Sequence, residues 1–314
     1  ISSAGSGTET HPRGGMMQIA ILGSGLIGSS WAALFLAHGH SVAFADPRHD
    51  AHNEALPAVE AAWKGLQALC PLGALPKERI RFHLTIGAAC ENADFVQECG
   101  PDRLHIKQAM LAEAESTLAP HVIIASSTSS LMPSDIQMEM KHPERLLVAH
   151  PMNPPHLVPL VELVCGSKTT PETLDQAKSF YETLGRVTVV ARKEVPGHIA
   201  NRLTSALYRE AVHMAAEGIA SVEDIDKAIA WGPGLRWALM GPHLIYHLGG
   251  GAGGYRGYLE HLGPTQANRW KALGEPRMDK ATIEALISGL QIELENLGNP
   301  SRNELEKARD DGLV

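Results

Sequence analysis

A histidine and a glutamate in the middle of the chain have the residue types and surroundings of an acid–base pair. His150 directly follows the apolar run 146–149, and Glu162 lies twelve residues further on, in the apolar stretch PLVELV. A carboxylate in such surroundings is costly unless it is paired. We therefore expect Glu162 to accept a hydrogen bond from one imidazole nitrogen of His150, which leaves the other nitrogen as a base. The alternative is a proline-rich turn that contains a histidine by chance.

Three glycines near the start of the chain predict a nucleotide-binding loop. Gly23, Gly25 and Gly28 stand between a predicted strand and a predicted helix, the context that supports a dinucleotide-binding fingerprint. Gly23 makes the tight turn, Gly25 lets the backbone approach a pyrophosphate, and Gly28 lets the helix pack against the strand. The phosphates would meet the free N–H groups of the helix N-terminus, where Leu26 and Ile27 lie.

An acidic residue at the end of the second predicted strand indicates which dinucleotide binds. Asp46 stands where an acid is expected to hydrogen-bond the adenosine ribose hydroxyls. Because a carboxylate repels a 2′-phosphate, we expect NAD rather than NADP. Two alternatives remain: Arg48 could receive such a phosphate, and Asp46 could be a turn residue before Pro47.

The pattern of apolar residues predicts two domains. Short apolar runs alternate with longer amphipathic segments up to Pro196, which is typical of βαβ units and a mostly parallel sheet. Beyond that point apolar residues recur at helical spacing only. We expect an α/β fold, with an N-terminal Rossmann-type parallel-sheet domain at 16–197 and an all-helical C-terminal domain at 198–314. Residues 1–15 are assigned to a disordered leader or cloning remnant.

The individual elements follow from the same pattern. The predicted strands are Gln18–Leu22, Ser41–Ala45, Phe95–Glu98, Val122–Ser126, Leu146–Ala149 and Val187–Val190. The predicted helices include Gly25–His38, Pro57–Leu69, His105–Leu118, Pro171–Leu184, Gly197–Glu217, Ser221–Ala230 and Lys280–Leu297.

The composition narrows the classes of partner. The formal net charge is −8, so the chain has no basic field to hold a nucleic acid or an anionic membrane surface. No apolar run in the sequence reaches about 18 residues, the length of a membrane span. The four cysteines form no Cys-x-x-Cys pair, as expected of reduced thiols in the cytoplasm. We expect a small-molecule substrate, and no nucleic-acid or membrane partner.

Three motifs resemble the L-3-hydroxyacyl-CoA dehydrogenase superfamily. They are SSTSSLMPS at 126–134, AHPMNPP at 149–155 and KEVPGHIANRL at 193–203. The likeness runs from Met17 to about Gly263, with the motifs in the expected order. It implies an NAD-binding domain followed by a helical domain that contributes to substrate binding and forms a homodimer.

The resemblance also implies roles for single residues. Its catalytic set falls on Ser129, His150, Glu162 and Asn201. His150 would take the proton of the 3-hydroxyl as C3 passes a hydride to the nicotinamide, while Ser129 and Asn201 would hydrogen-bond the oxygen that becomes a carbonyl. Three further residues resemble the family's cofactor contacts: Asn153 on the nicotinamide side, Glu98 on the ribose side, and Lys107.

Two features favour a small free acid over an acyl-CoA thioester. Few basic residues follow Asp46, whereas a CoA phosphate needs more positive charge. Arg236, in GPGLRWALMGP, could clamp a free carboxylate, or could be a surface salt-bridge arginine. The chain is most similar to the branch of the superfamily that contains L-gulonate 3-dehydrogenase (lambda-crystallin) and L-carnitine dehydrogenase. The implied function is NAD-dependent oxidation of the 3-hydroxyl of a small L-3-hydroxy acid to the 3-keto acid.

Two other functions and two minor features stay open. The chain could be a 3-hydroxyacyl-CoA dehydrogenase of fatty-acid metabolism, or a non-catalytic NADH-binding structural protein. Six aromatic residues between Trp231 and Trp270 could cage a trimethylammonium group, or could be helical core and dimer contact. His243 and His247 stand four apart, but no third ligand accompanies them, so we expect no metal site.

Overall fold

The computed structural model describes residues 15–314, which divide into two compact units. One unit ends at Ala200 and also takes in Lys307–Val314, and the other is Asn201–Glu306. The predicted boundary follows Gly197, and the prediction assigns 307–314 to the helical domain. The leader predicted at 1–15 lies, except for Gly15, outside the described residues.

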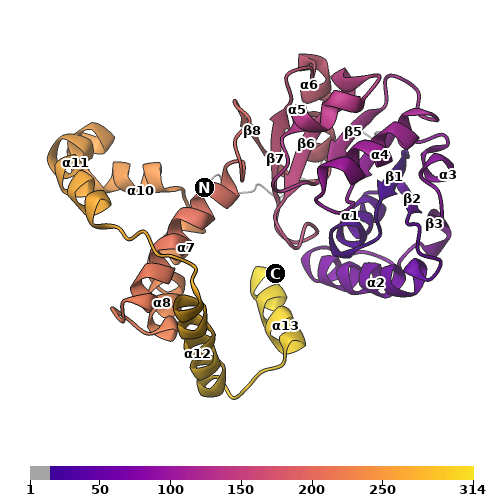
Figure 1. The fold of residues 1–314 in the computed structure, drawn as a ribbon. Coiled ribbons are helices and arrows are strands. Elements are labelled where there is room, and N and C mark those ends of the chain that lie inside the picture. The colour runs from indigo at the N-terminus through magenta and orange to yellow at the C-terminus, as the bar shows by residue number, and fades with distance from the viewer. Residues whose placement is uncertain (1–14) are drawn as a thin grey trace. The chain divides into compact units, whose positions relative to one another are not determined.

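The first unit is built on one sheet, which within residues 15–314 has eight strands in the order β3-β2-β1-β4-β5-β6-β7-β8 (Figure 1). Neighbouring strands are parallel except β6 and β7, which are antiparallel. The predicted α/β class with a mostly parallel sheet is confirmed. The strands are β1 Gln18–Leu22, β2 Ser41–Ala45, β3 Ile80–His83, β4 Phe95–Glu98, β5 Ile123–Ser126, β6 Leu146–Pro151, β7 Leu160–Cys165 and β8 Val187–Ala191.

Helices cover both faces of this sheet, and strand β1 shows how. Ile19 and Ile21 belong to a buried cluster with residues of α1, α2 and α6, whereas Ala20 and Leu22 belong to a second cluster with residues of α3, α4 and α5. Alternate side chains of a strand point to opposite faces, so a strand that is buried on both sides is apolar at every position. These helices are α1 Leu26–Ala37, α2 Ala51–Leu69, α3 Ile86–Cys90, α4 Leu104–Glu115, α5 Pro133–Ile136 and α6 Pro171–Thr183.

Strands β3 and β7 are not among the predicted strands, and helix α2 begins earlier than predicted; the other predicted elements agree with the structure to within about three residues at each end. Strand β3 is a short edge strand with an arginine and a histidine, and β7 carries Glu162 in its middle. Neither therefore shows an uninterrupted apolar run like those of β1 and β6. Helix α2 begins at Ala51 rather than at Pro57. Ala51 and Ala55 are buried, so packing extends the helix before the proline.

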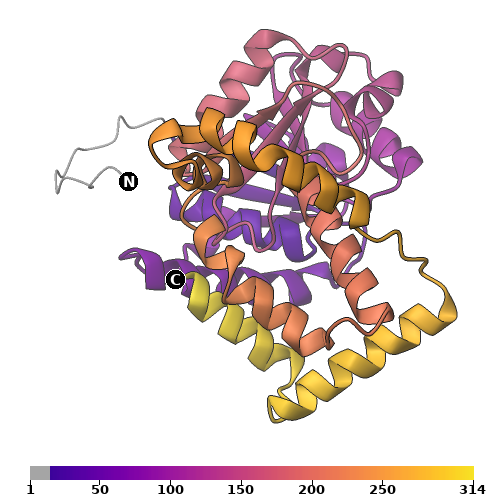
Figure 2. The same cartoon turned by 90° about the vertical axis from the view of Figure 1, so that its left-hand side faces the viewer.

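The second unit contains helices and no strand throughout Asn201–Glu306, all of which is described. Figure 2 draws these helices in salmon, orange and yellow. Helix α8 packs against α12, and α10 packs against α11. No helix of the described chain is both long and apolar enough to cross a membrane. The helices of the C-terminal part are α7 Ala200–Ala216, α8 Val222–Ala230, α9 Pro233–Trp237, α10 Pro242–Gly249, α11 Gly254–Ala272, α12 Lys280–Asn296 and α13 Arg302–Leu313.

The aromatic residues of this unit do not form a single core. Tyr246 and Tyr255 each stack on Tyr258, with ring centroids 4.5 and 6.4 Å apart. Tyr258 is buried, whereas Trp231 and Trp270 are exposed. The expectation of a helical core is therefore met by Tyr258, while the expected dimer contact of the exposed tryptophans stays a prediction.

The two histidines of α10 both bond to Tyr255. Nδ1 of His243 lies 2.8 Å from the tyrosine hydroxyl, and Nδ1 of His247 accepts from the Tyr255 N–H at 3.0 Å. Within residues 15–314 no group of three or more His, Cys, Asp or Glu side chains is placed to hold a metal ion.

Candidate active site

The predicted site residues of the first unit gather along one edge of the sheet. Strands β1, β2, β4, β5 and β6 are mutually parallel, so their carboxyl ends meet at the same edge. Gly23 follows β1, Asp46 follows β2, Glu98 ends β4, and His150 lies near the end of β6, while Ser129 comes three residues after β5. Ligands of open α/β sheets bind at this edge.

The glycine loop is tight at two positions and open at the third. A Cβ atom on Gly23, which has φ +105°, would lie 2.7 Å from the carbonyl oxygen of Cys99, and one on Gly28 would collide with the carbonyl oxygen of Gly23. A Cβ atom on Gly25 would meet nothing within 4 Å, and no side chain caps helix α1 there. Open space beside the uncapped first turn, which begins with Leu26 and Ile27, fits a pyrophosphate.

Asp46 is an ionised carboxylate held in place by its neighbours. Its Oδ2 accepts from the hydroxyl of Ser24 at 2.7 Å, and its Oδ1 accepts from the Arg48 Nε at 3.1 Å. Burial opposes ionisation, but the hydrogen bonds from Arg48 and Ser24 outweigh it and lower the pKa of Asp46 to about 2. Arg48 also pairs with Glu54 at 2.7 Å. The arginine that could receive a 2′-phosphate is thus bound to two acids.

The strand register brings His150 and Glu162 together. In the antiparallel pair of β6 and β7 the two residues are directly opposite each other, and such cross-strand partners have side chains on the same face of the sheet. Nδ1 of His150 lies 2.7 Å from Oε2 of Glu162. A carboxylate only accepts, so Nδ1 donates and Nε2 is left free of this bond.

Glu162 is fully buried and has both oxygens bonded. Its Oε1 accepts from the backbone N–H groups of Ile199 and Ala200, at 2.8 and 2.7 Å, where helix α7 begins. Burial alone would raise the pKa of Glu162, but the hydrogen bonds from His150 and from the helix N-terminus hold that pKa below its ordinary value. The acid therefore stays ionised and holds the imidazole.

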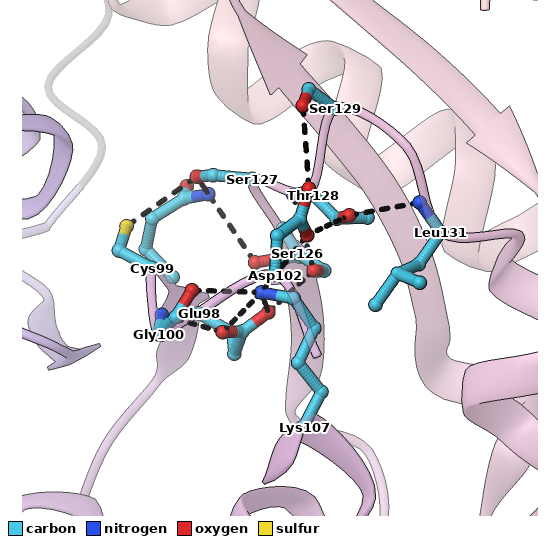
Figure 3. Close-up of polar contacts among 12 residues, drawn as sticks. Glu98, Cys99, Gly100, Asp102, Lys107, Ser126, Ser127, Thr128, Ser129 and Leu131 are labelled. Atoms are coloured by element: carbon cyan, nitrogen blue, oxygen red, sulfur yellow. Dashed lines mark hydrogen bonds and ion pairs between the residues drawn. The ribbon is translucent and has the colours of Figure 1, made fainter. Parts of the chain in front are cut away.

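The loop that carries Ser129 is fastened to a carboxylate that the sequence analysis missed (Figure 3). Asp102 accepts from the hydroxyls of Ser129 at 3.3 Å and Ser130 at 2.9 Å, and also from the hydroxyl of Thr128. The hydroxyls outweigh the effect of burial, so the pKa of Asp102 is lowered. A signal was present: Asp102 follows the end of β4 by four residues, at the edge where the other site residues lie.

Glu98 and Lys107 form a buried ion pair at the carboxyl end of β4. Both side chains are buried, and Nζ of Lys107 lies 2.8 Å from each oxygen of Glu98. Glu98 also accepts from the N–H of Gly100 and the hydroxyl of Ser126 (Figure 3). Every oxygen of Glu98 is thus occupied inside the protein. A charge on the inner strand β4 must be paired, and Lys107 supplies that partner. The cofactor contacts expected of Glu98 and Lys107 stay a prediction.

A second histidine beside the pair also escaped the sequence analysis. His198 is buried, its ring centroid lies 5.5 Å from that of His150, and its Nε2 lies 3.3 Å from the carbonyl oxygen of Thr128. It belongs to the motif GHIANRL, and the two residues that follow it bond Glu162.

The remaining predicted residues lie on other parts of the chain. Asn153 is exposed in the loop between β6 and β7, three residues after His150. Asn201 directly follows Ala200 and is the first residue of the second unit, and Arg236 is exposed on α9 of that unit. The approach of Asn201 and Arg236 to His150 stays a prediction.

Two family models match the chain. The 3-hydroxyacyl-CoA dehydrogenase NAD binding domain matches residues 18–195, and the 3-hydroxyacyl-CoA dehydrogenase C-terminal domain matches residues 197–285. The chain belongs to the 3-hydroxyacyl-CoA dehydrogenase family. The family predicted from the three motifs is confirmed, as is NAD as the cofactor of its N-terminal domain.

Two close relatives are named L-carnitine dehydrogenase. The chain is 44% identical over 297 residues to an L-carnitine dehydrogenase of Pseudomonas putida, covering 94% of this chain and 91% of that protein. It is 40% identical over 299 residues to an L-carnitine dehydrogenase of Oceanobacillus iheyensis, covering 95% and 96%.

Two solved structures of other dehydrogenases have a similar fold. An NAD-dependent 5-formyl-3-hydroxy-2-methylpyridine 4-carboxylic acid 5-dehydrogenase is similar with a TM-score of 0.79 and 26% identity, over 95% of this chain and 96% of that one. The 3-hydroxybutyryl-CoA dehydrogenase of Escherichia coli is similar with a TM-score of 0.63 and 30% identity, over 68% of this chain and 46% of that one.

Proposed function

We propose that this chain is an NAD-dependent dehydrogenase that oxidises the 3-hydroxyl of a small free L-3-hydroxy acid to the 3-keto acid. The observation that supports this function most is the bond between His150 and the fully buried Glu162, 2.7 Å long. A purely nucleotide-holding protein has no need of a buried carboxylate that orients an imidazole. The glycine loop, Leu26 and Ile27, and Asp46 would hold the cofactor.

Each residue of the candidate active site would have its own role in the reaction. Bound NAD⁺ supplies an acceptor for the hydride that leaves C3 of the substrate. His150 takes the hydroxyl proton on Nε2, and Glu162 stabilises the positive charge that the imidazole then carries. Asn201, from the start of the second unit, and Ser129, once its hydroxyl hydrogen turns from Asp102 to the substrate, would donate hydrogen bonds to the substrate oxygen as it becomes a carbonyl. Asn153 would contact the nicotinamide side of the cofactor.

The free acid is favoured over a CoA thioester by Arg236 and by the relatives. The relatives are named as dehydrogenases of L-carnitine. L-Carnitine is a 3-hydroxy acid with a free carboxylate, so it is the first candidate substrate. A single absorbance assay of NADH formation decides between a free acid and a CoA thioester. Its substrates are L-carnitine, L-gulonate, 3-hydroxybutyrate and 3-hydroxybutyryl-CoA. Preference for the thioester would make the chain a 3-hydroxyacyl-CoA dehydrogenase. No turnover of any of them would leave only an NADH-binding protein.

Replacing Arg236 by methionine is expected to raise KM for the free acid by about 10- to 100-fold, with kcat changed little. The substrate carboxylate would lose a charged partner that binds it in the ground state and the transition state alike. Steady-state kinetics with the best acid of the panel measures this. Arg256→Met is the matched control, because Arg256 is also exposed in the second unit and pairs with Glu260. An unchanged KM in Arg236→Met would contradict the carboxylate clamp.

The chain is also proposed to work as a homodimer in the cytoplasm. Helix α12 leaves Ile283, Ile287, Leu290 and Ile292 exposed, and apolar surface of this kind supports an association site. The four cysteines are free, which supports a reducing compartment. Sedimentation is expected to give twice the mass of one chain, and Ile287→Glu is expected to shift it towards the monomer. A monomeric parent chain would contradict the dimer.

A further inference from the structure

A short segment of the first unit, 197–200, touches both halves of the candidate active site. The backbone N–H groups of Ile199 and Ala200 hold Glu162, the partner of His150. The side chain of His198, between Gly197 and Ile199, reaches the carbonyl oxygen of Thr128, the residue before Ser129. One segment therefore links the acid–base pair to the Ser129 loop.

The conformation of His198 is unusual for a residue with a side chain. Its φ is +50°, in the left-handed region that favours glycine, and its N–H donates to the carbonyl oxygen of Val195 at 3.0 Å. The ring is 1% exposed. Strained backbone of this kind persists where surrounding contacts hold it, and it often occurs at functional sites.

The ring has one polar tether. A carbonyl oxygen only accepts, so the hydrogen of the ring lies on Nε2, which donates to Thr128. Nδ1 is buried and has no hydrogen-bond partner among the described residues. Burial lowers the pKa of His198, with the neighbouring His150 acting in the same direction. The ring is thus neutral at neutral pH, and its hold on the loop depends on this single bond.

The Ser129 loop is consequently held from two sides. Asp102 accepts from the hydroxyls of Thr128, Ser129 and Ser130 (Figure 3). His198 holds the main chain of the same loop and also lies against His150, with ring centroids 5.5 Å apart. Among the described contacts, His198 is thus the side chain that touches both the loop and the base.

We propose that His198 is a positioning residue that, through its bond to the Thr128 carbonyl, keeps Ser129 at a fixed distance from His150. This inference rests on the proposed function, in which Ser129 holds the substrate oxygen whose proton His150 removes. A shift of about 1 Å in such a constellation costs about 100-fold in rate. His198 therefore determines where the Ser129 hydroxyl lies.

A pair of variants of nearly equal length separates the hydrogen bond from the shape of the side chain. Glutamine can donate to the Thr128 carbonyl, whereas methionine cannot. We expect His198→Met to lower kcat by about 10- to 100-fold and His198→Gln to stay within about 3-fold of the parent chain. KM for NAD⁺ is expected to change less than about 2-fold in both, because the glycine loop is untouched. Equal losses in the two variants would overturn the tether.

A double-mutant cycle shows whether His198 acts through Ser129. If it does, His198→Met has almost no further effect on kcat in a Ser129→Ala chain, because the group it positions is already absent. Full additivity of the two losses would overturn the proposal. His198→Phe, which keeps a ring against His150 without the donor, is expected to behave as His198→Met; parent-like kcat in this variant would show that ring packing matters and not the bond.

Hydrogen exchange tests the tether without any turnover. The backbone N–H groups of Ser130 and Leu131 bond to the Thr128 hydroxyl, so they report on the order of the loop. We expect peptides that cover 127–134 to exchange faster in His198→Met than in the parent chain, and His198→Gln to match the parent. Identical exchange in all three would overturn the tether. If the parent chain oxidises no 3-hydroxy acid, the proposed function fails while this measurement still decides on the tether.

Discussion

Replacing His150 by glutamine is expected to lower kcat by about three to four orders of magnitude, with the affinity for NADH nearly unchanged. The amide cannot take the hydroxyl proton, so the chain would lose its base. The glycine loop and Asp46 lie at the ends of other strands, so the cofactor site is not changed. Single-turnover kinetics with the best acid, together with fluorescence titration by NADH, separates chemistry from cofactor binding.

A matched control is His40→Gln. His40 is also buried and bonds one backbone group, the N–H of Met17, but it precedes the amino end of β2, whereas His150 lies near the carboxyl end of β6. We expect this variant to keep kcat within about 2-fold of the parent. Turnover of His150→Gln at the rate of the parent would refute the assignment of His150 as the base.

The acid–base pair could be predicted from the sequence because its physical cause is local. A glutamate inside PLVELV must find a partner, and the nearest polar group after an apolar strand is His150. The register of β6 and β7 then places the two residues opposite each other. The glycine loop was predictable for the same reason, because a side chain at Gly23 or Gly28 would collide with nearby backbone. At Gly23 the collision is with the carbonyl oxygen of Cys99, and at Gly28 it is with the carbonyl oxygen of Gly23.

The parts that were missed depend on contacts between distant segments. Asp102 and Ser129 are 27 residues apart, and His198 is 70 residues from the Thr128 carbonyl that it holds. The position of Asp102 after β4 marks it as a residue of this edge, but neither stretch of chain indicates which distant group Asp102 or His198 contacts. The sequence also does not reveal that Lys107, on the following helix, bonds both oxygens of Glu98.

The cofactor preference depends on an acid that also neutralises an arginine. Asp46 and Glu54 together hold Arg48. Replacing Asp46 by serine is expected to remove the carboxylate that repels a 2′-phosphate and to free part of Arg48 to bind that phosphate. We expect the ratio of kcat/KM with NAD⁺ to kcat/KM with NADP⁺ to fall by about 100-fold, a shift of the size given by one charge-assisted contact.

Glu54→Gln is the control for this change, because it removes one acid from Arg48 but leaves Asp46 at the ribose. It is expected to shift the ratio by less than about 3-fold. An unaltered ratio in Asp46→Ser would show that the carboxylate does not face the ribose.

Glutamine in place of Glu162 is expected to be almost as damaging as the loss of the base, although it has the same shape. The two N–H groups of Ile199 and Ala200 both point at Oε1, so the amide must turn its oxygen towards them. Its NH₂ group then faces Nδ1 of His150 and can only donate. Nδ1 becomes the acceptor, the ring hydrogen moves to Nε2, and the nitrogen that should take the proton is already protonated. We expect kcat to fall by about 10²- to 10⁴-fold.

Nitrogen NMR of the imidazole tests the cause directly, because it distinguishes the two neutral tautomers. The parent chain is expected to carry the hydrogen on Nδ1 of His150, and Glu162→Gln on Nε2. Glu194→Gln provides the control, since Glu194 also accepts from a backbone N–H and a hydroxyl, both of Ser134, and is expected to keep kcat within about 3-fold. If Glu162→Gln retained the parent's kcat, or lost it with the hydrogen still on Nδ1, the carboxylate would not be orienting the base.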